Sequence, residues 1–338
     1  MNEITLYNPL DMHLHLREGS MLESVLPFTA RAFSAALAMP NLKSPLTTLE
    51  SALAYKEQIL SLSAGQDFMP LMSMFLTPSL DRAQLEAAKK EGINILKLYP
   101  KGSTTGSEGG VGGILDKEIL EIFSLAEELG FILSIHGESN GFCMEREWEF
   151  LEVFRIIARD FPRLQTIIEH ISDRRSLEVI EAHPSLYGTL TLHHISLSLD
   201  DLCGGMLNPH LFCKPMLKTK KDRDALREAA LSAHKKISFG SDSAPHLESA
   251  KLSARGAAGI FSAPILLPAL TELFEAHNAL DNLQAFVSDN ASQIYGLQSL
   301  PKKAVKLIKK PFEVQSVRTP EGAIIPLFMG KSISWSLA

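Results

Sequence analysis

The sequence predicts one (β/α)8 barrel of the TIM type with a small C-terminal appendage. Short apolar runs alternate with amphipathic helical segments almost from end to end of the 338 residues. The runs number eight, the strand count of such a barrel, and chains of about this length commonly form one. From about residue 301 the pattern changes to KKAVKLIKKPFEVQ and AIIPLFMGKSISW. We therefore expect a barrel over residues 1–300 and a segment packed on it over residues 301–338.

The candidate strands are short and their spacing leaves room for helices. One intervening helix is expected to start near Ser79 and stop at Gly92, and another to start at Asp116 and stop at Gly130. A doubly wound open sheet is the alternative, but no GxGxxG motif follows the first strand. The eight expected strands cover residues 9–16, 35–40, 68–76, 94–100, 131–137, 164–171, 187–194 and 236–242.

Composition argues against several functional classes. Hydrophobic residues make up 45% and charged residues 21%, with a formal net charge of -6, so a basic nucleic-acid footprint is not expected. The longest apolar stretch contains prolines and has no membrane-length run. Three scattered cysteines and an N-terminus unlike a signal peptide favour a reducing cytoplasm. We expect a cytoplasmic protein without nucleic-acid or membrane partners.

The first strand carries an unusual alternation, PLDMHLHLREG. In an extended strand His13, His15 and Arg17 share one face, while the apolar residues between them occupy the other. Buried polar side chains need partners. Two interpretations stay open from this spacing alone: an ordinary half-exposed strand, or a face that points into a metal site.

Further ionisable residues collect where the other strands end, which is where barrel enzymes place catalytic groups. His136 ends the run FILSIH and His170 ends LQTIIEH. A single histidine at a strand end is more often structural. Two of them at equivalent ends, beside a His-x-His pair, indicate a site of four imidazoles that suits zinc.

Lys97 and Asp242 complete this group. Lys97 stands in the apolar run NILKLYP; the ordinary alternative is a lysine that snorkels to the surface. A buried amine has a depressed pKa, and a neutral amine can add carbon dioxide to form a carbamate that bridges two metals. Asp242 in FGSDSAPH is either a turn or cap residue, or a carboxylate that binds metal and moves protons. His246 follows at the mouth, where it could meet an anionic substrate.

The motifs HLHLR, MPNL, KLYP, IHGE, IEHI and GSDSAPH together resemble the bacterial dihydroorotases of the amidohydrolase superfamily, in their shorter, barrel-only form. The similarity extends to NPHLFCKPMLK, FSAPILLPAL, NASQIYGL and GKSISW, and so covers nearly the whole chain. The resemblance implies the reversible cyclisation of N-carbamoyl-L-aspartate to (S)-dihydroorotate, the third step of pyrimidine synthesis. It also implies a small-molecule substrate and a homodimer.

The resemblance implies two zinc ions in the site. One is bound by His13 and His15 together with Asp242, which also serves as the catalytic proton carrier. The second is bound by His136 and His170. Lys97, as N6-carboxylysine, bridges the two ions.

The same resemblance implies how substrate is held. Arg17, Asn41 and His246 match a clamp for the substrate carboxylate, and a guanidinium with an amide can hold a carboxylate by several hydrogen bonds. The clamp favours a small carboxylated ring.

A glycine-rich loop, KGSTTGSEGGVGG at residues 101–113, follows the fourth strand. Glycine content alone indicates only flexibility. By resemblance the loop is a lid, with Thr104 and Thr105 reaching substrate when it closes. Backbone contacts to substrate are implied at Lys214 and Ala258.

Two other functions stay open. A hydantoinase or allantoinase would use the same metal residues on a different ring. A non-catalytic barrel acting as a scaffold for aspartate transcarbamoylase would be expected to have lost metal ligands, and all six positions are filled here. His193 and His194 are expected on strand 187–194 in ordinary polar packing; support of a metal ligand is the less favoured role.

Overall fold

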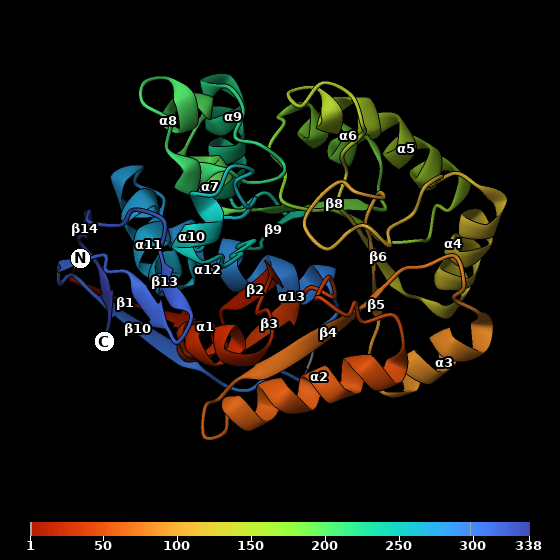
Figure 1. Cartoon of the computed structure of the whole chain (residues 1–338), viewed down its shortest axis with the longest axis horizontal. Coiled ribbons are helices and arrows are strands. Elements are labelled where there is room, and N and C mark those ends of the chain that lie inside the picture. The colour runs from red at the N-terminus through yellow and green to blue at the C-terminus, as the bar shows by residue number, and fades with distance from the viewer. Residues whose placement is uncertain (1, 298) are drawn as a thin grey trace.

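The computed structural model describes residues 2–297 and 299–338. Its main sheet contains eight parallel strands whose spatial order equals their chain order, with helices on the outside (Figure 1). In a doubly wound sheet the order of the strands would reverse at a switch point inside the sheet, so that alternative is wrong and the (β/α)8 barrel is confirmed. The strands are β2 Leu10–Leu14, β3 Ala35–Ala38, β4 Met69–Phe75, β5 Ile95–Leu98, β6 Ile132–Ile135, β7 Thr166–Ile168, β8 Leu186–Leu190 and β9 Ile237–Phe239.

The first and last strands meet just beyond their carboxyl ends. Leu14 forms a parallel bridge with Ser243, and the backbone N–H of Asp242 donates to the carbonyl of His13 at 2.7 Å. This contact closes the barrel and brings residues more than 200 positions apart in the chain to the same place.

The helices begin and end at residues with clear local causes. Asp81 caps α3 by accepting from the backbone N–H of Gln84, so this helix starts later than the expected Ser79. α4 ends as expected at Gly130, whose φ of 69° suits glycine. The larger helices are α1 Gly19–Ala32, α2 Leu49–Leu62, α3 Arg82–Lys90, α4 Lys117–Leu129, α5 Arg146–Asp160, α6 Arg175–Ala182, α9 Lys220–Leu231 and α11 Leu266–Ala276; shorter ones are α7 Leu192–Ser196, α8 Leu199–Cys203, α10 Glu248–Lys251, α12 Leu280–Gln284 and α13 Asn290–Ile294, with a 3₁₀ turn η1 at Pro209–Leu211.

One expected strand is partly a helix. The strand predicted at 187–194 ends at Leu190, and His193 and His194 lie on α7 instead. The cause is Thr191, whose side chain accepts from the backbone N–H of His194 and starts the helix.

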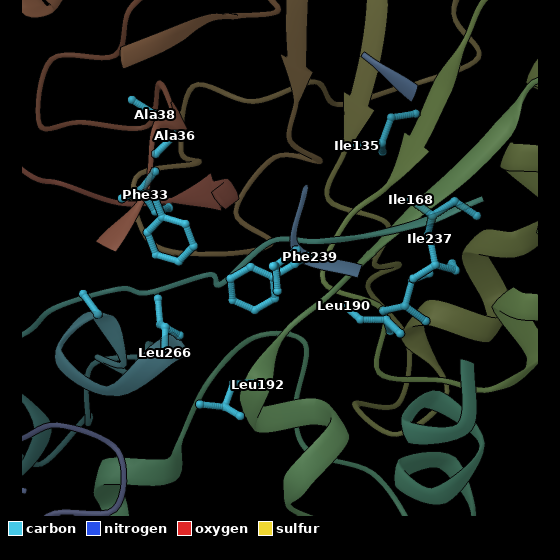
Figure 2. Close-up of a cluster of buried hydrophobic side chains, with 14 of the residues drawn as sticks. Phe33, Ala36, Ala38, Ile135, Ile168, Leu190, Leu192, Ile237, Phe239 and Leu266 are labelled. Atoms are coloured by element: carbon cyan, nitrogen blue, oxygen red, sulfur yellow. The ribbon is translucent and has the colours of Figure 1, made fainter. Parts of the chain in front are cut away.

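Apolar side chains fill the layer between the strands and the surrounding helices. Figure 2 shows Phe33 and Phe239 together near Leu266 of α11, and the two rings stack with centroids 6.1 Å apart. Both rings are fully buried. Such packing holds the strand ends in fixed positions, which a site built from several strands requires.

The C-terminal segment forms small antiparallel sheets beside the barrel (Figure 1). One of these sheets includes a strand from the N-terminus: β1 Glu3–Tyr7 pairs with β10 Ala304–Ile308, which pairs in turn with β15 Ser336–Leu337. The expected boundary at residue 300 stays a prediction. Within residues 2–297 and 299–338, no helix has the length and apolarity needed to cross a membrane.

Candidate active site and metal centre

A small cavity of about 20 Å³ lies at the carboxyl ends of the barrel strands. Lys97 and His246 are the two predicted site residues that do not line it. Lys97 is fully buried, and His246 lines a larger pocket nearby. The predicted residues that do line it are His13, His15, Arg17, Asn41, Thr104, Thr105, His136, His170, Lys214, Asp242 and Ala258.

His13, His15 and Asp242 form one group of potential metal ligands. Nε2 of His15 lies 3.0 Å from Oδ1 of Asp242, and Nε2 of His13 lies 3.6 Å from the same oxygen. Burial lowers the pKa of both imidazoles, so the rings are neutral and can offer lone pairs. Burial raises the pKa of Asp242, which makes its carboxylate a better proton acceptor.

The strand that carries His13 is shorter than the alternation suggests. β2 ends at Leu14, and Arg17 adopts a positive φ of 61°. His15 and Arg17 therefore lie beyond the strand, and the prediction that they share one strand face with His13 is wrong. The turned backbone still brings the guanidinium of Arg17 to the cavity, where Nη2 lies 3.1 Å from Nε2 of His246.

His136 and His170 form a second group. Nδ1 of His136 lies 3.0 Å from Nε2 of His170. The other nitrogen of His136 lies 2.8 Å from Oε2 of Glu138, which assigns the ring proton to that side. Two ligand nitrogens on one tetrahedral zinc ion would be about 3.3 Å apart given zinc–nitrogen bonds of about 2.0–2.1 Å. The observed separation is close to that value.

Lys97 supplies a test of whether a metal centre fits. Its side chain is fully buried, and Nζ finds no hydrogen-bond partner among the described residues. Burial lowers the pKa of the amine to about 8, although Glu169 and Asp242 oppose the shift. A buried ammonium without hydrogen bonds is costly, whereas a metal-bound carbamate would use this position well. Together with the two ligand groups, this residue set fits a binuclear centre.

Glu169 is a supporting residue that the sequence did not indicate. Its Oε2 lies 2.8 Å from Nδ1 of His13, and its two oxygens accept from the hydroxyls of Ser134 and Thr189. Burial would raise the pKa of Glu169, but His13, Lys97 and these hydrogen bonds lower it to about 2. Such a carboxylate fixes the tautomer and the orientation of a histidine ligand. The available signal was an acidic residue inside the apolar run IIEHI.

The glycine-rich loop is seated over the cavity. The carbonyl of Thr105 accepts from Nδ2 of Asn41 at 2.9 Å. Gly106 follows with a φ of 71°, and a Cβ at this position would lie 2.9 Å from the carbonyl oxygen of Asn41. The close approach therefore requires glycine. Outside the loop, Arg17 and His246 line a larger pocket of about 970 Å³.

Lys251 is a second residue that the sequence did not indicate. Its buried Nζ donates to the carbonyls of Phe212 and Gly259, each at 2.7 Å. The N–H of Gly259 also donates to the Phe212 carbonyl, at 2.9 Å. These bonds join the two segments that bring Lys214 and Ala258 to the cavity.

Comparisons with known proteins agree with this architecture. The amidohydrolase family model matches residues 10–300. A dihydroorotase of Helicobacter hepaticus is 64% identical over 335 residues, which is 99% of this chain and 97% of that protein.

Two solved structures are similar over nearly their full length. The crystal structure of dihydroorotase from Campylobacter jejuni has a TM-score of 0.95 and 42% identity, covering 99% of this chain and 97% of that one. Dihydroorotase from Saccharomyces cerevisiae, in complex with 5-fluoroorotic acid, has a TM-score of 0.94 and 34% identity, covering 100% and 99% of the two chains. The match of the family model over most of the chain, with relatives this similar, shows that the chain belongs to the amidohydrolase family.

Proposed function

We propose that this chain is a zinc-dependent dihydroorotase, which interconverts N-carbamoyl-L-aspartate and (S)-dihydroorotate plus water. The observation that carries the proposal is one cavity in which Asp242 lies 3.0 Å from His15, with Arg17 at its edge. A ligand group, a proton carrier and an anion anchor thus converge on one small space. The 64% identity to a dihydroorotase supports the substrate assignment.

The proposal includes two zinc ions, in keeping with the donor set of the cavity. His13, His15 and Asp242 would hold one, His136 and His170 the other, and Lys97 as N6-carboxylysine would bridge them. When bound, such a pair supplies Lewis-acid polarisation of the amide carbonyl and an activated water as nucleophile.

Side chains at the edge of the cavity would bind the substrate carboxylate. The guanidinium of Arg17 can donate two parallel hydrogen bonds to it, and Asn41 and His246 can add one each. Arg17 also donates through Nε to the carbonyl of Pro245 at 3.2 Å, a contact that orients its guanidinium. A ring without a carboxylate would leave this cation unpaired.

The loop over the site and two backbone segments would complete the binding of substrate. Thr104 and Thr105 lie at the inner cavity, so substrate entry requires the loop to move and its return excludes water. Lys214 and Ala258 would contribute backbone groups. These roles rest on the resemblance and on the positions of the residues at the cavity.

Asp242 would move the proton. In the hydrolytic direction its carboxylate takes a proton from the attacking water and returns it to the ring nitrogen that leaves. In the cyclisation direction the same steps run in reverse. Its burial raises the pKa above the usual range for aspartate, which brings the carboxyl closer to the working pH.

The alternatives account for fewer of these features. A hydantoinase or allantoinase would use the same metal ligands, but its substrate ring carries no carboxylate for Arg17 to bind. A scaffold protein has no need of six preserved ligand positions in one place. Composition supports a cytoplasmic location, and the homodimer stays a prediction from the resemblance.

The test is an ultraviolet assay of the purified protein with dihydroorotate, hydantoin and allantoin, following loss of the ring amide. We expect turnover of dihydroorotate and formation of it from carbamoyl aspartate. Turnover of hydantoin or allantoin with none of dihydroorotate would contradict the substrate assignment. No turnover of any cyclic amide by the zinc-loaded protein would favour the scaffold.

A further inference from the structure

A second cluster of metal-ligating side chains lies outside the residues that the proposed reaction uses. It consists of His193 and His194 on α7 and Cys213 in the segment after η1. One ligand atom from each lies within 4.8 Å of the others, and all three side chains are buried.

His193 shows that this cluster lacks a component. Its side chain is fully buried, yet within the described chain neither Nδ1 nor Nε2 has a hydrogen-bond partner. A neutral imidazole carries one N–H donor and one lone pair, and burying both without partners costs free energy. A buried polar group of this kind calls for a water molecule or an ion that satisfies it.

The neighbouring atoms favour an ion. Nε2 of His194 and Sγ of Cys213 both form hydrogen bonds to the carbonyl oxygen of Pro215, at 3.1 and 3.2 Å, and a bound ion would replace these two bonds. Two imidazoles, a thiol and a carbonyl therefore surround one small volume. Nitrogen and sulfur donors together suit zinc and other thiophilic ions, and not magnesium or calcium.

The ligands need only modest movement to bind. Zinc–nitrogen bonds of about 2.0–2.1 Å and a zinc–sulfur bond of about 2.3 Å place tetrahedral ligands roughly 3.3–3.6 Å apart. The separations of up to 4.8 Å between ligand atoms must therefore shrink by up to about 1.5 Å. His193 has no hydrogen bond to lose, so rotation of its ring towards Cys213 breaks no contact of that kind.

Charge decides which form of Cys213 can bind. Burial raises the pKa of the thiol, while the nearby ammonium of Lys251 acts in the opposite direction. That ammonium repels a cation as well. An ion can therefore bind only if it displaces the thiol proton and takes the thiolate as a ligand.

We propose that His193, His194 and Cys213, with the carbonyl of Pro215, form a separate site for one thiophilic divalent ion such as zinc. The site goes beyond the proposed catalytic function and shares no ligand with the binuclear centre. A bound ion would fasten α7 to the segment that carries Lys214 into the active-site cavity.

Cobalt provides a probe that distinguishes this site from the catalytic one. A cobalt–thiolate bond gives a charge-transfer absorption band in the near ultraviolet, and the catalytic donor set contains no thiolate. We expect the metal-stripped protein to develop this band when Co²⁺ is returned. The Cys213→Ser variant should lose the band and bind one fewer Co²⁺ per chain, while a Cys143→Ser/Cys203→Ser variant should keep both.

A second variant guards against loss of folding. His193→Gln keeps the thiol, and its circular dichroism spectrum should match that of the parent protein. Titration of the cobalt–thiolate band should show an apparent affinity for Co²⁺ that is at least tenfold lower. Absence of the band in folded parent protein at saturating Co²⁺, or its survival in Cys213→Ser, would overturn the proposal. The readout is independent of turnover, so failure of the proposed dihydroorotase function would leave this result unaffected.

Discussion

Glu169 holds the His13 ring from behind: its carboxylate lies 2.8 Å from Nδ1, while Nε2 of the same ring lies 3.6 Å from Asp242. Because the Nδ1–H group donates a hydrogen bond to Glu169, the lone pair of His13 lies on Nε2 and faces the cavity. A metal ligand needs this tautomer. The second histidine group repeats the arrangement, since Glu138 lies 2.8 Å from Nε2 of His136.

The Glu169 contact predicts a pH-dependent stability. The pKa of this group falls from 4.5 to about 2 in the folded protein, so its contribution is complete above pH 4.5 and is lost as pH falls towards 2. In metal-free protein Glu169→Gln should lower the free energy of unfolding by up to about 3 kcal/mol at pH 6, given 1.36 kcal/mol per pKa unit. Urea titrations should show a smaller difference at pH 3.5. Glu128→Gln, at an exposed ion pair, is the control; a Glu169 effect that is equal at both pH values would refute the assignment.

Asp242 should be needed for turnover and not for folding. Asp242→Asn keeps the shape of the side chain but removes the proton acceptor, and loss of general acid–base catalysis typically costs about 10²–10⁴-fold. We expect kcat to fall by that amount with an unchanged circular dichroism spectrum. A variant that retains more than a tenth of the parental kcat would exclude Asp242 as the proton carrier.

The close approach of Gly106 to Asn41 predicts the effect of one methyl group. Gly106→Ala would place Cβ 2.9 Å from the Asn41 carbonyl and strain a φ of 71°, so the loop could not seat as observed. We expect a raised KM and a lowered kcat in steady-state assays. Gly109→Ala is the matched control, because its Cβ would meet nothing within 4 Å. Equal kinetics for the two variants would argue against loop closure as part of turnover.

Lys251 should act on substrate binding through the segments that it joins. Lys251→Met removes two hydrogen bonds from an ammonium to backbone carbonyls, each worth about 1.5–3 kcal/mol. We expect KM to rise about tenfold with a smaller change in kcat. Lys236→Met is the control, since Lys236 also bonds two carbonyls, those of Ile180 and His183, before the start of β9. Similar loss of stability in both variants with a KM change only in Lys251→Met is expected; equal KM values would show that Lys251 is merely structural.

The residues that sequence patterns identified are those with local signals. Gly130 marked the end of α4, and the histidines at the ends of apolar runs marked the site, because strand ends in a barrel share one rim. The run YGTLTLHH alternates like a strand, yet Thr191 caps a helix after Leu190. A short apolar run fits both the 3.6-residue period of a helix and the two-residue period of a strand, so the boundary between β8 and α7 could not be predicted.

Other features depend on contacts between distant parts of the chain. The positive φ of Arg17 follows from the turn that leads from the barrel into α1, and no alternation of residue types reveals it. Glu169 meets His13 across 156 positions, and Lys251 meets Phe212 across 39. Side chains that support a site through such contacts become visible only once the barrel is closed.

The most direct test of the catalytic centre returns zinc to metal-stripped protein and follows hydrolysis of dihydroorotate, with and without bicarbonate. Activity of the parent protein should be absent without zinc, return as zinc is added, and depend on bicarbonate, because Lys97 needs carbon dioxide to form its carbamate. Lys97→Met should stay inactive under all these conditions. Full activity of the metal-free parent protein, or parental activity in Lys97→Met, would contradict a centre bridged by Lys97.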